Sequence, residues 1–283
     1  MKSFRLIFAF FLFLALQPEA AGQDSIKPYF FIQVTDTQFG MFSGNMDYTK
    51  ETELYTKVVE AINRLDPDFV VFTGDLVNEK DNWDQIDEFK RLTAGIDQRI
   101  TLYYSPGNHD IGQAPAQVDI DKFISDHGHD RFSVKHKGSL FIGLNSCLIK
   151  SKTPELENIQ FNWLNQELSD GKEAIHSVIF THYPFFIKWH REPETYSNIP
   201  KDIRKKYLKL FKEKGVDAVF AGHLHNNSSA KYRDMDMITT SASGKPLGRA
   251  PSGLRVIKVF RDKIESVYYS IEEIPETISL SGN

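Results

Sequence analysis

At 283 residues the chain is long enough for one large domain with a buried core, and α/β folds of this size commonly stay undivided. Its formal net charge is −4, which excludes the overall positive field that holds nucleic acid by its phosphates, so no nucleic-acid binding is expected. Any attraction for phosphate must therefore be local.

The first residues have the composition of a secretory leader. Two basic residues precede an apolar run over 6–16, and small residues follow at 20–22. The run is shorter than the ~20 apolar residues that span a bilayer, although a retained anchor stays open as an alternative. We expect a signal peptide at 1–22 and a single domain at 23–283. The mature protein would then be exported, periplasmic or extracellular, with no stable membrane anchor after cleavage of the leader.

Two further features of the sequence bear on the cellular compartment in which the protein resides. Cys147 is the only cysteine, so no intrachain disulfide can form. Overlapping glycosylation acceptors begin at Asn226 and Asn227, directly after His225, where a glycan would cover the candidate site described below. A bacterial-type periplasm or exterior therefore suits the chain better than a glycosylating compartment.

Runs rich in β-branched and aromatic residues recur along the chain and predict strands. Several are apolar throughout, as strands covered on both faces are. These runs lie at 29–35, 69–73, 101–105, 140–145, 177–181 and 218–221. Helical spacing of apolar residues between them predicts helices, for example at 54–65, 161–168 and 203–211. The alternation predicts an α/β fold, a two-sheet sandwich with mixed sheets flanked by helices.

The last part of the chain has a different pattern. Runs at 235–241, 254–260 and 264–270 look like consecutive strands, the last two joined by a short turn. We expect these runs to form a hairpin-rich second sheet.

Five short polar blocks carry the chemistry, and each follows a predicted strand. They are Asp36-Thr37-Gln38, Gly74-Asp75, Gly107-Asn108-His109-Asp110, His182 and Gly222-His223-Leu224-His225. Ligands of α/β sheets sit beyond the carboxyl ends of the strands, so these blocks should converge on one cleft. Together they offer oxygen and nitrogen donors to two adjacent metal ions, with Asp75 as the natural bridge. The pattern indicates metal-assisted phosphoester hydrolysis.

The order and type of these blocks resemble the calcineurin-like metallophosphoesterase superfamily over nearly the whole chain beyond the leader. Within it, the stretches most similar to the calcineurin-like phosphoesterase domain-containing protein 1 group are Asp36-Thr37-Gln38-Phe39-Gly40, Gly107-Asn108-His109-Asp110-Ile111-Gly112 and Gly222-His223-Leu224-His225. The stretch Leu247-Gly248-Arg249 resembles that group too. That group resembles phosphoprotein Ser/Thr phosphatases. The resemblance implies the two-sheet sandwich and a phosphoric ester hydrolase.

The resemblance also implies a ligand set for two metal ions. Metal one would be held by Asp36, Gln38, Asp75 and His225, and metal two by Asp75, Asn108, His182 and His223. Carboxylate, amide oxygen and imidazole suit Mn, Fe, Zn or Mg. Gln38 replaces the His that the superfamily pattern has at this position. We therefore expect metal one to bind loosely, to exchange readily, or to be a harder ion such as Mg or Mn.

Two cations that share a carboxylate lie roughly 3.5 to 4 Å apart, where a bridging water loses a proton near neutral pH and can attack phosphorus. His109 directly follows a ligand and is assigned as the proton donor to the leaving oxygen, a role that the resemblance also implies. Asp110 is expected to fix the tautomer of His109. The candidates for substrate binding are Asn108, Arg191 and Arg249, the two arginines as bidentate phosphate clamps.

We therefore expect a monomeric dinuclear phosphomonoesterase that acts on a small phosphoester or a phosphorylated macromolecule. Two alternatives stay open. A phosphodiesterase acting on nucleotides or glycerophosphodiesters would use the same hydroxide and differ in what the pocket rim accepts. A catalytically silent metal-binding or phosphate-binding protein would keep the same scaffold without the reaction.

Overall fold

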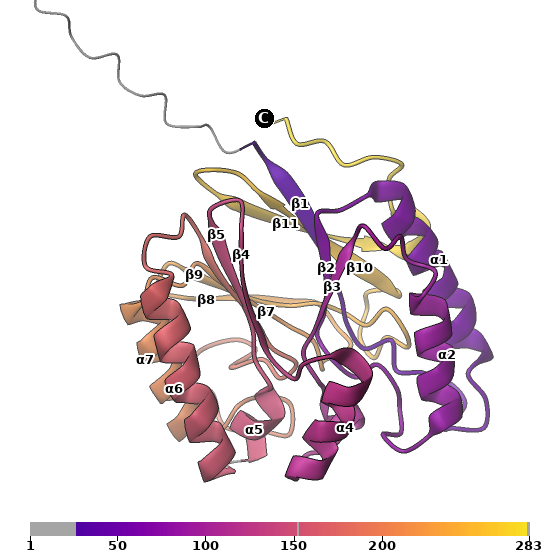
Figure 1. The fold of residues 1–283 in the computed structure, drawn as a ribbon, viewed down its shortest axis with the longest axis horizontal. Helices are drawn as coiled ribbons and strands as arrows, with labels where there is room; N and C mark the ends of the chain where they lie inside the picture. Colours follow the sequence, from indigo (N-terminus) through magenta and orange to yellow (C-terminus); the bar gives the residue numbers. More distant parts are fainter. Residues whose placement is uncertain (1–26, 152, 282–283) are drawn as a thin grey trace, which may run out of the picture.

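The computed structural model describes residues 27–151 and 153–281 (Figure 1). The predicted signal peptide at 1–22 lies outside the described residues. Within the described ranges, no helix combines the length and apolar character needed to cross a membrane.

Two β-sheets pack face to face between outer layers of helices (Figure 1). The strands are β1 (Tyr29–Val34), β2 (Phe69–Phe72), β3 (Thr101–Tyr104), β4 (Phe132–His136), β5 (Ser139–Gly143), β6 (Ser177–Phe180), β7 (Ala218–Ala221), β8 (Ser228–Tyr232), β9 (Met235–Thr239), β10 (Gly253–Val259) and β11 (Ile264–Ser270). The helices are α1 (Thr49–Leu65), α2 (Trp83–Thr93), α3 (Asn108–Ile111), α4 (Gln117–His127), α5 (Ser146–Ser151), α6 (Pro154–Asp170), α7 (Lys201–Glu213) and the 3-10 turn η1 (Ile271–Glu273).

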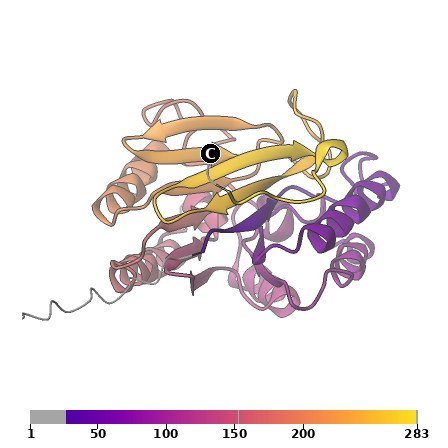
Figure 2. The ribbon, with the colours of Figure 1, turned by 90° about the horizontal axis from the view of Figure 1, so that it is seen from above.

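The strand order explains why the polar blocks meet. One sheet has the order β11-β10-β1-β2-β3 and the other β4-β5-β6-β7-β9-β8. Strands β1, β2 and β3 are parallel, and so are β5, β6, β7 and β9, so each set ends at one edge of its sheet. Helices α1 and α2 lie outside the first sheet, and α6 and α7 lie outside the second (Figures 1 and 2). The predicted two-sheet sandwich with mixed, helix-flanked sheets is confirmed.

The strands of the last part of the chain do not form a sheet of their own, so that prediction is wrong. β9 joins the second sheet beside β7, whereas the hairpin of β10 and β11 joins the first sheet beside β1 (Figure 2). β10 is buried along nearly its whole length, which suits an interior strand, and β11 is mostly partly exposed or exposed, which suits an edge. The polar edge strands β4 and β8 were not predicted, because their sequences lack the apolar runs of buried strands.

An aromatic layer fills the space between the sheets. Phe31 of β1 stacks on Phe69 of β2 with ring centroids 4.6 Å apart, and both rings meet Phe141 of β5 edge-on. Phe180 of β6 stacks on Phe220 of β7 at 6.0 Å. Because these side chains alternate with residues that face the helices, each strand is held on both faces. The carboxyl ends of the strands are therefore fixed in position for the groups that follow them.

Candidate metal centre

The five polar blocks converge beyond the strand ends, as predicted. The structure contains two groups of possible ligand atoms, and the atoms of each group all lie within 4.8 Å of one another. One group consists of Asp75, His182 and His223, and the other of Asp36, Asp75 and His225. All five residues are buried, and Asp75 belongs to both groups. The structure therefore brings together donors for two adjacent ions around one carboxylate.

The donor atoms of the first group, and that of Asn108, lie close to His182 Nε2. His182 Nε2 lies 3.2 Å from Asp75 Oδ2, 3.1 Å from His223 Nδ1 and 3.2 Å from Asn108 Oδ1. In the second group, His225 Nε2 lies 3.3 Å from Asp36 Oδ1. These atoms belong to the residues that the sequence assigned to metal two and metal one, respectively.

Backbone carbonyls orient two of the imidazole rings. His182 Nδ1 donates to the carbonyl of Thr73 at 2.9 Å, and His225 Nδ1 donates to the carbonyl of Lys245 at 2.5 Å. Since a carbonyl only accepts, the hydrogen sits on Nδ1 and Nε2 is left as the ligand atom in each ring. Such outer contacts fix the tautomer of metal-binding histidines.

Gln38 provides an independent test of whether the residues fit a metal ion. Its side chain is buried, and Oε1 has no hydrogen-bond partner, whereas Nε2 donates to Asn78. A buried acceptor without a partner costs about 1–3 kcal/mol. A cation beside Oε1 would remove that cost, and the whole set of carboxylates, amide oxygens and imidazoles suits a divalent ion such as Mn, Fe, Zn or Mg. The residues of the centre therefore fit the divalent metal ions that the sequence predicts.

The neighbouring carboxylates and imidazoles of the centre shift one another's pKa values. Burial opposes ionisation of Asp75, but the adjacent His182 outweighs it and lowers the pKa of Asp75. Burial likewise opposes the charged form of His182, and Asp75 overcomes it and raises the pKa of His182 to about 9. Burial and the nearby His182 charge lower the pKa of His223 to about 3. Asp75 is thus held ionised beside a protonated His182, and a cation that binds His182 Nε2 would displace the proton there.

The backbone is strained at the ligand positions. Nine non-glycine residues in the described part of the chain have positive φ, and five of them are proposed ligands. These are Asp36, Gln38, Asp75, His223 and His225. Sparsely populated conformations of this kind cost of order 1–3 kcal/mol each and cluster at functional sites. The fold therefore carries strain to turn these side chains off the strand ends.

A close approach of two loops fixes Asp75. A Cβ atom at Gly107 would lie 2.2 Å from Asp75 Oδ1, and one at Gly74 would lie 2.2 Å from the Gly107 nitrogen. Only glycine fits at both positions, and Gly74 also has φ of 84°. Asp75 Oδ1 in turn accepts from the backbone nitrogen of His109 at 2.8 Å, which leaves Oδ2 for His182.

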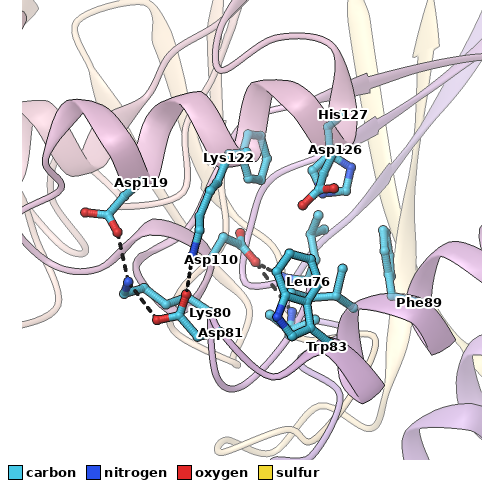
Figure 3. Close-up of a pocket in the computed structure, with 13 residues that line it drawn as sticks. Leu76, Lys80, Asp81, Trp83, Phe89, Asp110, Asp119, Lys122, Asp126 and His127 are labelled. Carbon is cyan, nitrogen blue, oxygen red and sulfur yellow. Dashed lines mark hydrogen bonds and ion pairs between the residues drawn. The ribbon is translucent and has the colours of Figure 1, made fainter.

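The expected contact between Asp110 and the His109 ring is not found among the described residues. His109 Nδ1 instead lies 2.7 Å from the carbonyl oxygen of Asn78, which places the hydrogen on Nδ1. Asp110 Oδ1 accepts from the backbone of Leu76 at 2.8 Å (Figure 3). Asp110 Oδ2 accepts from the backbone of Gly107 at 2.8 Å. Asp110 therefore ties two loops together and leaves the tautomer of His109 to Asn78.

Asp110 also lines a separate crevice between α2 and α4 (Figure 3). Ion pairs of Lys80 and Lys122 with Asp81 lie at this crevice, and none of the seven proposed metal ligands lines it. The cavity volume is about 30 Å³, room for a water molecule or two, so we do not place a substrate there.

The two arginines predicted to bind phosphate, Arg191 and Arg249, make no hydrogen bond or ion pair within the described ranges. Arg191 and Arg249 are both exposed. The loop that carries Arg249 is tied to the centre, because the nitrogens of Leu247 and Gly248 donate to the His225 carbonyl at 2.9 and 3.2 Å. Both side chains are therefore free to meet a ligand, and neither is positioned by the site itself.

Sequence reasoning missed Tyr196, which lies beside two proposed ligands. Its hydroxyl accepts from Asn108 Nδ2 at 3.4 Å, and its ring centroid lies 5.0 Å from that of His223. Its side chain is nonetheless 53% exposed. An aromatic residue in a loop has no signal in the sequence that separates it from its neighbours, such as the equally exposed Trp189.

Hydrogen bonds to two buried charged side chains hold the loop that presents Tyr196. Arg204 of α7 is fully buried and donates to the carbonyls of Ile199 and Glu192. The Glu192 carboxylate accepts from the backbone nitrogens of Ile187 and Lys188, each at 2.8 Å. These contacts satisfy two buried charged groups and tie the backbone on both sides of Tyr196 to α7.

Paired groups of carboxylates and imidazoles at the strand ends of a two-sheet sandwich suit a hydrolase that binds two metal ions. A family model described as calcineurin-like phosphoesterase matches residues 31–227. The chain belongs to the calcineurin-like phosphoesterase family, which confirms the resemblance seen in the sequence.

Several known proteins are similar to this chain. It is 36% identical over 268 residues to the serine/threonine-protein phosphatase CPPED1 of Mus musculus. The matched region covers 88% of this chain and 86% of that protein. A purple acid phosphatase from yellow lupin has a TM-score of 0.63 at 15% identity, covering 87% of this chain and 52% of that one. A dimetal phosphatase from Danio rerio has a TM-score of 0.57 at 15% identity, covering 87% and 100%. The two solved structures have the same fold.

Because Asp75 belongs to both groups of ligands, Asp75→Asn should abolish the binding of both ions, whereas Gln38→Ala should weaken only one. We expect the Mn²⁺ content after dialysis, measured by mass spectrometry, to fall from two ions per chain to near zero in the first variant and toward one in the second. Asp119→Asn, at a surface ion pair, is the control. Two retained ions in Asp75→Asn would contradict the shared carboxylate.

Proposed function

We propose that this protein is a dinuclear metal-dependent phosphomonoesterase. The observation that carries the proposal is the carboxylate of Asp75, which belongs to two groups of buried metal-ligand atoms at once. Metal one would be held by Asp36, Gln38, Asp75 and His225, and metal two by Asp75, Asn108, His182 and His223. Two divalent cations at such a site neutralise charge on a phosphoryl group and make water a stronger nucleophile at neutral pH.

His109 is suited to deliver a proton to the leaving oxygen. Its backbone nitrogen donates to Asp75, which keeps the residue beside the metal ligands, and the Asn78 carbonyl holds the hydrogen on Nδ1. Nε2 is therefore the nitrogen that can exchange a proton with a substrate. Asp110 contributes indirectly, by joining the loops on which Asp75 and His109 lie.

Tyr196 is the residue of the rim that is best placed to meet the phosphoryl group. Its hydroxyl accepts from Asn108 Nδ2, so its own hydrogen is available for donation. A phosphoryl oxygen bound beside Asn108 would lie within reach of that hydrogen. The exposed part of the ring would face the organic part of the substrate.

The preference for a monoester is supported by similarity to serine/threonine-protein phosphatases over most of the chain. A phosphodiesterase is the competing assignment, since the same centre can attack a diester. Turnover of p-nitrophenyl phosphate and of bis(p-nitrophenyl) phosphate, compared with Mn²⁺, Zn²⁺ and Mg²⁺, tests the proposal. We expect the larger kcat/KM for the monoester. A larger value for the diester with every metal would replace our assignment by the phosphodiesterase.

Replacing His109 tests its role as a proton donor. General acid catalysis contributes ~10² to 10⁴ in rate, so His109→Ala should lower kcat by that factor for an alkyl phosphate. The loss should be smaller for p-nitrophenyl phosphate, whose leaving group needs little protonation. Metal content should not change, and His190→Ala, at an exposed histidine, is the control. Equal losses for both substrates would argue against proton donation, and no loss at all would favour the catalytically silent alternative.

Removing only the hydroxyl of Tyr196 tests its contact with phosphate. A hydrogen bond to a charged group is worth about 1.5–3 kcal/mol, so Tyr196→Phe should raise KM and the inhibition constant of inorganic phosphate about tenfold or more. Metal content should stay the same. Tyr232→Phe, a tyrosine for which the described structure records no hydroxyl hydrogen bond, is the matched control. Unchanged phosphate inhibition would remove Tyr196 from the substrate site.

A further inference from the structure

Four amide side chains connect the metal-one position to the surface. Gln38 Nε2 donates to Asn78 Oδ1 at 3.0 Å, and Asn78 Nδ2 donates to Asn45 Oδ1 at 2.7 Å. Gln85 Nε2 donates to the same Asn45 oxygen at 2.9 Å. Gln38 and Gln85 are buried and Asn45 is exposed. We call these four side chains, Gln38, Asn78, Asn45 and Gln85, the amide chain.

One end of the amide chain is anchored on the backbone. Gln85 Oε1 accepts from the backbone nitrogens of Asn78 at 3.1 Å and Glu79 at 3.0 Å. A backbone N–H can only donate a hydrogen bond. Gln85 must therefore present its oxygen to these two nitrogens and its amino group to Asn45. An amide side chain can otherwise present either end, and its orientation follows from its partners.

The orientation of Gln85 fixes the orientation of the other three side chains of the amide chain. Asn45 must offer its oxygen to Gln85, and the same oxygen then takes a hydrogen from Asn78. Asn78 is left to offer its own oxygen to Gln38. Gln38 must therefore use its amino group in this bond and leave Oε1 as the buried, unpartnered end. Reversal of any one amide would set two donors or two acceptors against each other.

The surrounding backbone is shaped to hold the amide chain. A Cβ atom at Gly40 would lie 2.3 Å from Gln85 Nε2 and 2.9 Å from Asn45 Oδ1, and Gly40 has φ of 101°. The amide chain also reaches His109, the proposed proton donor, because the backbone carbonyl of Asn78 is the hydrogen-bond partner of His109 Nδ1. Asn78 thus contacts both a proposed metal ligand and the proposed general acid.

We propose that Asn78, Asn45 and Gln85 are positioning residues that force Gln38 to present its oxygen, and not its amino group, to the metal-one ion. This inference rests on the proposed two-metal site. An amide coordinates a hard cation through oxygen only, so the orientation of Gln38 decides whether metal one has its full set of ligands. Within the described part of the chain, no hydrogen bond joins Gln85 directly to a proposed ligand, and Gln85 nonetheless controls the affinity of metal one through the amide chain.

Gln85→Glu should reverse the amide chain. The new carboxylate still accepts from the two backbone nitrogens, but it has no hydrogen to give Asn45. Asn45 must then turn its amino group toward position 85, Asn78 must turn its oxygen toward Asn45, and Gln38 must turn its amino group toward the metal. The added negative charge alone would strengthen cation binding, so the two effects have opposite signs.

The experiment is a titration of the metal-free full chain with Mn²⁺, followed by electron paramagnetic resonance and calorimetry. Gln85→Glu should weaken one of the two Mn²⁺ sites about tenfold or more, a change of about 1.4 kcal/mol. The other site should keep its affinity. A gain in affinity, an equal change at both sites, or no change would overturn the inference.

Asn45→Asp is the charge-matched control. It adds the same charge to the amide chain but keeps an acceptor where Asn45 Oδ1 accepts now, so the direction of the amide chain is preserved. Its metal-one affinity should equal or exceed that of the natural chain. A loss as large as that of Gln85→Glu would mean that charge or packing is responsible and would overturn the inference.

A rescue variant separates orientation from folding. Gln38→Glu presents an oxygen in either orientation, so Gln38→Glu combined with Gln85→Glu should bind metal one at least as tightly as Gln38→Glu alone. A tenfold loss in the double variant would overturn the inference. Should Gln85→Glu fail to fold, as judged by circular dichroism, Asn45→Ala breaks the amide chain at its exposed member, between Asn78 and Gln85, and should weaken metal one several-fold. Unchanged affinity there would equally overturn it.

Hydrolysis of p-nitrophenyl phosphate by the natural chain is measured in parallel. If that chain binds two Mn²⁺ ions and is active while Gln85→Glu keeps both affinities, only the role of the amide chain is wrong. If the natural chain binds fewer than two ions or is inactive, the proposed function fails together with it.

Discussion

The two oxygens of the Asp75 carboxylate have different partners, and the site is arranged around that division. Oδ1 accepts from the backbone nitrogen of His109, and Oδ2 lies 3.2 Å from His182 Nε2. The residue can hold this position because Gly74 and Gly107 let their loops approach more closely than any side chain would allow. Since Asp75 belongs to both groups of ligand atoms, its placement decides whether two cations can be bound side by side. The strained backbone at the other ligand positions serves the same end, and the aromatic layer between the sheets supplies the rigid frame.

Much of this arrangement follows from the sequence. Apolar runs that end in Asp, Asn or His residues predict parallel strands with polar groups at their carboxyl ends, and the topology of such strands brings those groups together. For this reason we expected five side chains to lie together, and the structure brings their possible ligand atoms close to one another; they are Asp36, Asp75, His182, His223 and His225. Residue type and position relative to a strand carry that information.

Contacts made through the backbone or between neutral side chains were not predictable. The carbonyl of Asn78 orients His109, but any residue has a carbonyl, so the sequence pointed instead to the acidic neighbour Asp110. The amide chain that orients Gln38 joins residues up to 47 positions apart, and amides at those positions give no pattern in the sequence. The assignment of β9 and β10 to different sheets was missed for a similar reason. An apolar run predicts a strand, but it does not show which neighbouring strand it pairs with or how deeply it is buried.

The most direct test of the account is a crystal structure of the full chain soaked with Mn²⁺, with anomalous scattering recorded at the Mn absorption edge. The account predicts two anomalous peaks, one on each side of the Asp75 carboxylate, with Gln38 Oε1 turned toward the peak beside Asp36 and His225. A single peak, or two peaks of which only one contacts Asp75, would contradict it.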